Sequence, residues 1–162
     1  MISLLWWNVS ENIFLGREVM EGLSLNHKKM DEEAQKILDD LGISMKSTEL
    51  AGDLKVSEQQ MVEIAKALSQ DAKVLIMDEP TSALSRKEIE DLFRVIRKLR
   101  DEGRGIIYIS HRLDELRAIV DKVSILRDGE NVISGDLKDF SIDDIIRHMV
   151  GREIQDKFPR IH

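Results

Sequence analysis

The sequence predicts an α/β fold in which a largely parallel sheet follows a helical N-terminal region. The first observation behind this prediction is the apolar run of residues 74–77, which leads into Asp78, Glu79 and Pro80. A continuous apolar run that ends at a breaker is typical of a strand buried on both faces, as in a parallel sheet. The second observation is that such runs alternate with stretches of helical periodicity, an order that indicates parallel strands joined by helices.

The first 70 residues are expected to form a layer of helices. Residues 10–21 show weak helical spacing, and Gly22 and Asn26 mark a turn after them. The clearest helix ends at Gly42, and a further helix is expected over residues 61–68. The apolar stripe of the clearest helix, spaced by three and four residues, consists of Met30, Ala34, Ile37, Leu38 and Leu41.

From residue 71 onward, strands and helices alternate. Strands are expected at residues 73–77, 105–109, 122–127 and 131–134, and helices at 86–100, 113–120 and 141–149. The helix over 86–100 is expected to turn inward Ile89, Leu92, Phe93, Ile96 and Leu99. Asp128 and Gly129 are a strong signal for a hairpin turn, and Ser141 is expected to cap the last helix. Residues 155–162 show little periodicity and are interpreted as a linker.

The composition is that of an ordinary globular domain with a net negative charge. The chain has 162 residues, 42% of them hydrophobic, and a formal net charge of −7 at pH 7. This charge and the lack of a basic cluster argue against a nucleic-acid-binding protein. No cysteine is present, which excludes disulfides and thiolate metal sites. The apolar residues 1–7 lack a basic flank and are too short to span a bilayer, so a soluble, cytoplasmic protein is expected.

Asp78 and Glu79 are the first candidates for chemistry. They follow a predicted strand, and ligands of open α/β sheets lie beyond the carboxyl ends of such strands. In phosphoryl transfer, one carboxylate there holds Mg²⁺ and a second group positions or deprotonates the attacking water. The alternative is a carboxylate pair that caps the following turn.

Several sequence strings together resemble an ABC-type ATPase. They are QQMVEIAKALS, LIMDEPTSALS, GIIYISHRLDE and HMVGRE, and in this order they are similar to the first cassette of monosaccharide importers of the ribose, xylose and galactose type. The resemblance covers residues 9–159 and implies the C-terminal part of that cassette, with an incomplete P-loop NTPase-like sheet. It also implies three regions, namely a helical subdomain with the signature motif (1–70), a partial ATPase core (71–153) and a tail or linker (154–162).

The resemblance gives Asp78, Glu79 and His111 specific roles. Asp78 would hold Mg²⁺, through water, and Glu79 would be the base for the water that attacks the γ-phosphate. His111 follows the strand expected at residues 105–109 and would donate a hydrogen bond to the γ-phosphate as a sensor of ATP. The alternative for His111 is a structural or incidental histidine at a strand end.

Two further segments match motifs of the family. The signature segment, which would bind the ATP held by the opposite cassette, comprises Leu54, Lys55, Val56, Ser57, Glu58 and Gln59. Here Lys55 stands where the family has serine, and Val56 and Ser57 replace a glycine pair, so the hydroxyl contact is lost and this half-site is expected to be weakened. The D-loop, which would cross to the opposite cassette, comprises Ser82, Ala83, Leu84 and Ser85. Ser85 replaces the usual aspartate and also suits a helix cap.

The phosphate cradle of the family is not found in the sequence. No G-x-x-x-x-G-K-[ST] string occurs, and the nearest glycine pair, Gly103 and Gly105, precedes a strand rather than a helix. ATP and Mg²⁺ are the cofactors of the family, but without the cradle we expect this chain alone to bind and hydrolyse ATP negligibly. A truncated gene product, an isolated domain or a disrupted reading frame would each explain the missing half.

The resemblance also implies partners and a place in the cell. The intact parent would couple ATP hydrolysis to monosaccharide uptake together with membrane subunits and a second cassette, at the inner face of the plasma membrane. The missing half would leave an apolar face exposed, so a homo-oligomer is expected, with residues 1–7 as a plug. The main alternative is a non-catalytic module that docks on the membrane subunit or another cassette. A less favoured one is another P-loop-like enzyme with a degenerate cradle.

Overall fold

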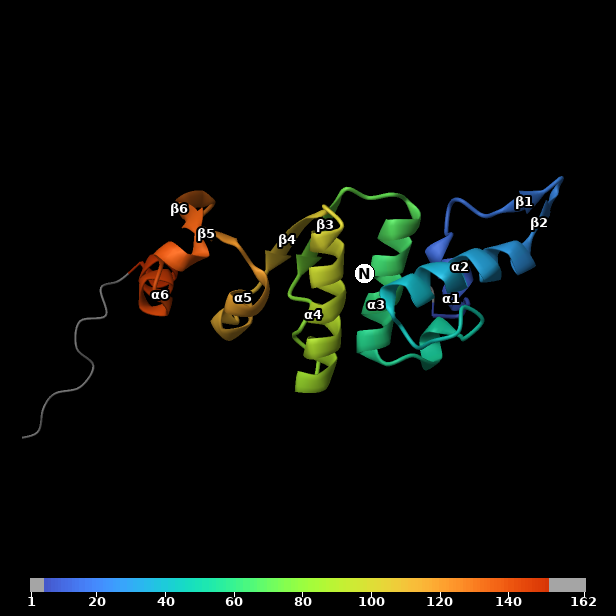
Figure 1. Ribbon diagram of the computed structural model, residues 1–162, viewed down its shortest axis with the longest axis horizontal. Helices are drawn as coiled ribbons and strands as arrows, with labels where there is room; N and C mark the ends of the chain where they lie inside the picture. The colour runs from blue at the N-terminus through green and yellow to red at the C-terminus, as the bar shows by residue number, and fades with distance from the viewer. Residues whose placement is uncertain (1–4, 152–162) are drawn as a thin grey trace, which may run out of the picture. The chain divides into compact units, whose positions relative to one another are not determined.

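A computed structural model describes residues 5–151 of the chain. These residues form two compact units, the first ending at Ser110 and the second beginning at His111. Figure 1 shows the first unit in blue to yellow, with helices beside a short pair of strands, and the second in orange to red. Residues 154–162, predicted to be a tail or linker, lie outside the described residues, as do residues 1–4 of the predicted plug.

Three helices form the layer at the start of the first unit. They are α1 (Val9–Ile13), α2 (His27–Leu41) and α3 (Val56–Ser69), and each contacts the other two. α1 is shorter than the expected helix over residues 10–21, because the chain turns into a small hairpin, β1 (Met20–Glu21) and β2 (Ser24–Leu25). The connector before α3 contains a short 3-10 helix, Ala51–Asp53.

The helix predicted to end at Gly42 is confirmed as α2. Asn26 caps its first turn by accepting a hydrogen bond from the Lys29 amide at 2.9 Å. Gly42 ends it in the left-handed conformation, with φ of 69°, which glycine adopts without steric cost. The predicted stripe is buried at Met30, Ala34, Leu38 and Leu41, whereas Ile37 is half-buried.

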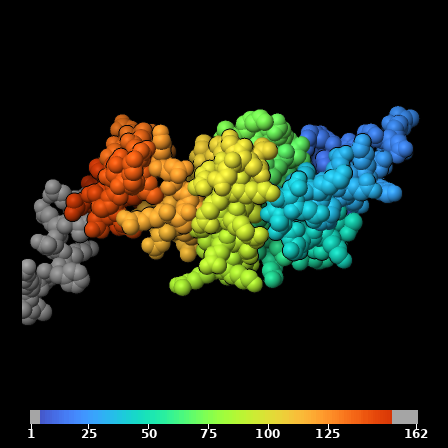
Figure 2. Space-filling model, viewed as in Figure 1, coloured from blue at the N-terminus to red at the C-terminus, as the bar shows by residue number. Residues whose placement is uncertain are grey.

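The core of the α/β region is a parallel strand pair with a crossover helix. β3 (Val74–Asp78) pairs with β4 (Gly105–Ile109), and α4 (Arg86–Asp101) connects them. β3 is shifted by one residue from the expected strand, so that Asp78 is its last residue. Figure 2 shows the surface of α4 meeting the end of α2, where the Lys98 ammonium donates to the Asp40 carbonyl.

The prediction that these strands are buried on both faces is wrong for the described residues. One face is covered, since Leu75 and Met77 are buried and Tyr108 packs edge-on against Phe93 of α4, with ring centroids 6.3 Å apart. The opposite face is open, and its exposed apolar side chains are Val74, Ile76, Ile107 and Ile109. We call these four the open sheet face. The reason is that the crossover helix covers a single side of a two-stranded sheet.

The second unit contains a hairpin and two helices. α5 (Leu113–Ile119) precedes β5 (Lys122–Arg127) and β6 (Glu130–Asp136), and α6 (Ile142–Val150) follows the 3-10 helix Leu137–Asp139. The predicted turn is confirmed, because Asp128 and Gly129 have φ of 52° and 82°, the left-handed values of a tight hairpin. The predicted cap is confirmed as well, since the Ser141 hydroxyl accepts from the Asp144 amide at 3.1 Å.

Candidate functional site

Asp78 and Glu79 lie at the carboxyl end of β3, as predicted. Asp78 is exposed and pairs in register with Ile109, the last residue of β4. Glu79 is half-buried, and its amide donates to the Ile109 carbonyl at 2.9 Å, which extends the ladder by one hydrogen bond. Its φ of 47° is left-handed, a conformation that non-glycine residues seldom adopt and that is enriched at functional sites.

The D-loop candidates follow in two consecutive turns. The Ser82 amide donates to the Glu79 carbonyl at 3.2 Å, and the Leu84 amide donates to the Thr81 carbonyl at 3.1 Å. Thr81 is fully buried, whereas Ser82 and Ala83 are exposed. These turns carry the chain from the end of β3 to Ser85, which caps α4 as predicted.

The signature segment is more helical than predicted. The prediction was a loop over residues 54–59, but α3 already begins at Val56, so the last four of the six candidates lie in its first turn. The cause is local, because the Lys55 amide donates to the Glu58 carboxylate at 2.9 Å and so satisfies the start of the helix. Val56 and Ser57 occupy the positions at which a glycine pair would have opposed helix formation.

Glu88 joins the two segments and was not among the predicted site residues. One of its carboxylate oxygens, Oε2, accepts hydrogen bonds from the Ser85 amide at 2.8 Å and the Ser85 hydroxyl at 2.6 Å. The other, Oε1, accepts from the hydroxyl of Ser57 at 2.6 Å. The Ser-x-x-Glu capping pattern was readable in the sequence. No sequence signal indicated the bond to Ser57, which is 31 residues away.

These hydrogen bonds stabilise the charged form of Glu88. They hold the pKa of its carboxyl at about 2, below the ordinary value of 4.5. The Ser57 hydroxyl contributes most, followed by the hydroxyl and amide of Ser85, and the positive charge of Lys55 adds to them. Glu88 therefore accepts hydrogen bonds as an anion at neutral pH.

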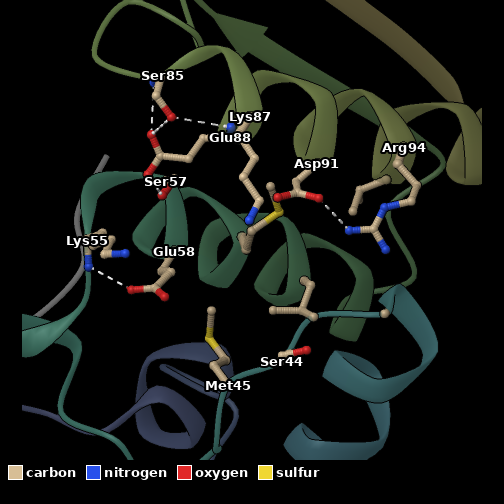
Figure 3. Close-up of a pocket in the computed structure, with 14 residues that line it drawn as sticks. Ser44, Met45, Lys55, Ser57, Glu58, Ser85, Lys87, Glu88, Asp91 and Arg94 are labelled. Atoms are coloured by element: carbon tan, nitrogen blue, oxygen red, sulfur yellow. Dashed lines mark hydrogen bonds and ion pairs between the residues drawn. The ribbon is translucent and has the colours of Figure 1, made fainter.

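A pocket of about 570 Å³ opens beside this carboxylate. Figure 3 shows it between the connector at Ser44 and Met45, the first turn of α3 and the exposed side of α4. Its charged lining is balanced in sign, with Lys55, Lys87 and Arg94 against Glu58, Glu88 and Asp91. Arg94 is paired with Asp91 at 2.9 Å.

His111 lies in the other compact unit, of which it is the first residue. It is exposed, and it precedes α5 by two residues. Next to it, the Arg112 guanidinium pairs with the buried carboxylate of Glu115 at 2.9 Å. The structure therefore brings Ser57, Ser85 and Glu88 together. It puts Asp78 and Glu79 at the end of one strand, and His111 belongs to the other compact unit.

The residues present do not fit a complete nucleotide site. Among residues 5–151, no group of three or more acidic or histidine side chains is arranged to hold a metal ion. Gly103 and Gly105 do not form a cradle either. The Gly103 and Arg104 amides donate to carbonyls of the last turn of α4, and Gly105 is the first residue of β4. This segment therefore connects the end of a helix to the start of a strand.

Comparison with protein families and sequences shows what the chain resembles. A family model described as ABC transporter matches residues 6–82. A protein named as a ribose/galactose/methyl galactoside import ATP-binding protein of Agrobacterium fabrum is 52% identical over 152 residues, which cover 94% of this chain. The galactose/methyl galactoside import ATP-binding protein MglA of Mannheimia succiniciproducens is 47% identical over the same number of residues. The chain spans 30% of the length of each of these relatives.

Solved structures show the same fold. A nucleotide-free ATP-binding cassette from an ABC transporter superposes with a TM-score of 0.72 and 24% identity, over 92% of this chain and 61% of that cassette. Another cassette, in its ADP conformation, gives a TM-score of 0.70 with 25% identity, over 91% of this chain and 60% of the other. The predicted α/β fold of the P-loop NTPase type is thereby confirmed.

Proposed function

We propose that the chain belongs to the ABC transporter family of ATP-binding proteins and that it supplies part of the ATP-binding subunit of a sugar importer. The observation that carries this proposal is the 52% identity to a sugar-import ATP-binding protein, which extends over 94% of the chain. It includes the strand end at Asp78 and Glu79 and the two segments joined by Glu88. The intact subunit would couple ATP hydrolysis to monosaccharide uptake.

In that subunit, the carboxyl end of β3 would face the nucleotide. Asp78 would contact Mg²⁺ through water, since Mg²⁺ keeps much of its hydration shell. Glu79 would act as the base for the attacking water, and its left-handed backbone supports this role because strain is stored at functional sites. His111 would sense the γ-phosphate, and the signature and D-loop segments would face the opposite cassette.

The chain by itself would bind ATP negligibly, because it offers no backbone cradle for the β-phosphate. Calorimetric titration of MgATP into the purified chain tests this expectation, with the full-length Agrobacterium fabrum relative as the positive control. We expect heat of binding with the relative and none with the chain. Micromolar binding to the chain would show that an oligomer or another segment rebuilds the site.

A chimera tests whether these residues work inside a complete cassette. Residues 9–151 would replace the matching segment of the Agrobacterium fabrum relative, and steady-state ATP hydrolysis would be measured. We expect the chimera to hydrolyse ATP and Glu79→Gln to reduce the rate by about 10²-fold or more, as expected for loss of a general base. The matched control is Glu90→Gln on the exposed side of α4. It should leave the rate within twofold, a change of at most about 0.4 kcal/mol in activation free energy. A Glu79→Gln chimera that hydrolyses ATP at the unchanged rate would refute the role of Glu79.

We further propose that the helical layer docks on a membrane subunit, at the inner face of the plasma membrane. This is supported by the β1–β2 hairpin, whose exposed apolar side chains are Met20, Leu23 and Leu25. Within residues 5–151, no helix is both long and apolar enough to cross a membrane. The test is capture of the chain by a sugar-importer membrane subunit in lipid nanodiscs. We expect Leu23→Asp to reduce the capture and the control Leu126→Asp to leave it unchanged.

The same hairpin supports the second candidate function, a non-catalytic module that docks without hydrolysis. The chimera separates the two possibilities. If it binds the membrane subunit but hydrolyses no ATP, the docking module is favoured. If it hydrolyses ATP and loses the activity with Glu79→Gln, the catalytic subunit is favoured.

A further inference from the structure

α3 and α4 are joined at their first turns by one carboxylate. α3 begins at Val56, inside the signature segment, and α4 begins at Arg86, directly after the D-loop segment. Glu88, in the first turn of α4, reaches Ser57, in the first turn of α3. Figure 3 shows both side chains at the rim of the pocket, with Ser85 above them.

The two oxygens of Glu88 serve different purposes. Oε2 closes the cap of its own helix with Ser85, which is a local bond of the kind found at many helix starts. Oε1 makes a bond of 2.6 Å to Ser57, which is only 7% exposed and so is held in place by its surroundings. A hydroxyl that donates to a charged acceptor at this distance forms a strong hydrogen bond.

We propose that Glu88 is a positioning residue that couples residues 54–59 to residues 82–85, by binding Ser57 and Ser85 with the two oxygens of one carboxylate. A displacement of either segment then changes the hydrogen bonds of the other. Whether this coupling affects contacts with nucleotide rests on the proposed function. The coupling itself needs only the residues of this chain. It also means that the Ser57 hydroxyl holds the two helices together and is not available to a phosphate.

Other charged groups face the same carboxylate. Lys55 precedes α3, and Glu58, Lys87, Asp91 and Arg94 line the adjoining pocket. Their charges nearly cancel, and Lys55 favours the ionised form of Glu88. The bond from Ser57 is therefore the feature that separates Glu88 from an ordinary helix cap. Asp144 provides the comparison, because it caps α6 with Ser141 in the same way, and the bonds that define its cap are all local.

The first measurement is a carbon-detected NMR titration of the Glu88 carboxyl in the full chain. In the native protein we expect a pKa near 2, as the two hydroxyls require. Ser57→Ala should raise this pKa toward 4.5, and Ser57→Thr, which restores a hydroxyl, should return it toward the native value. A pKa that is the same in the native and Ser57→Ala chains would overturn the proposal.

The second measurement is amide hydrogen exchange, which follows both segments at once. Glu88→Gln should speed exchange by about tenfold or more at residues 54–59 as well as 82–88, since a hydrogen bond to a charged group is weakened in each place. The matched control, Asp144→Asn, should speed exchange around residues 141–144 alone. Changes confined to residues 82–88 in Glu88→Gln would show a local cap and no coupling. Neither readout uses nucleotide, so failure of ATP binding leaves this test unaffected.

Discussion

Glu88 shows how a single residue links two distant parts of the chain. Its position in the capping pattern of α4 is a local matter, whereas its bond to Ser57 depends on how α3 and α4 pack. The hydroxyl that makes this bond belongs to Ser57, one of the two residues that stand in place of the glycine pair of the family pattern.

The low pKa of Glu88 predicts how stability depends on pH. Its folded pKa of about 2 lies below the ordinary value of 4.5, so the unfolded chain binds the proton more readily. The contribution of Glu88 is therefore fully present above pH 4.5 and is lost as the pH falls toward 2. Urea unfolding should show Glu88→Gln to be less stable than the native chain at about pH 6, with a smaller difference at about pH 3.

The control for this prediction is the same substitution in a Ser57→Ala, Ser85→Ala background. Without the two hydroxyls, the folded pKa of Glu88 should approach its ordinary value, and the pH-dependent part of the difference should shrink. In the native background, a stability difference between the native and Glu88→Gln chains that is equal at both pH values would contradict the assignment.

At the scale of elements, each helix end or turn named here is set by residues next to it in the sequence. Gly42 ends α2, Asn26 and Ser141 cap their helices, and Asp128 with Gly129 forms the tight turn of the second unit. The hairpin is further tied to α6, because the Arg127 guanidinium donates to the His148 carbonyl at 2.9 Å.

The hairpin turn predicts a specific effect of Gly129→Ala. Gly129 has φ of 82° and no atom near the place of an added Cβ, so the cost comes from the backbone alone. We expect a loss of about 1–2 kcal/mol in unfolding free energy, the cost of a left-handed conformation for a residue with a side chain. Urea unfolding measures it, and Asp128→Asn, which tolerates the same conformation, should change stability by less than about 0.5 kcal/mol.

At the scale of the whole molecule, the open sheet face is the exposed apolar face that the missing half of the cassette was expected to leave. Ile76 and Ile107 are paired across β3 and β4 and are 68% and 49% exposed. Apolar patches of this kind on a sheet are prone to association. We therefore propose that copies of the chain associate through this face.

Sedimentation velocity tests this association. Ile76→Ser with Ile107→Ser should weaken it by about tenfold or more, because burying each isoleucine contributes about 1.5–3 kcal/mol. The control is Leu126→Ser in the second unit, which alters an apolar side chain that is 73% exposed and should leave the association unchanged. A native chain that sediments as a monomer at micromolar concentration would refute the proposal.

The sequence by itself determined the local features of this protein. The end of α2, the caps of α4 and α6, the hairpin turn and the strand that stops at Asp78 and Glu79 all follow from short-range signals, namely capping side chains, left-handed glycines and apolar runs. The family was also readable, because its motifs are short strings in a set order. The signature segment was predicted less well, since the capping bond between Lys55 and Glu58 extends the helix where a loop was expected.

Only the tertiary structure decided which surfaces are covered and which distant residues meet. The apolar runs of β3 and β4 suit burial on both faces, but burial requires a second layer, and the described residues supply α4 on one side alone. Likewise, the bond between Ser57 and Glu88 depends on the packing of two helices whose residues are far apart in the chain. Periodicity and capping act over a few residues, whereas coverage and cross-helix contacts depend on the whole arrangement of elements.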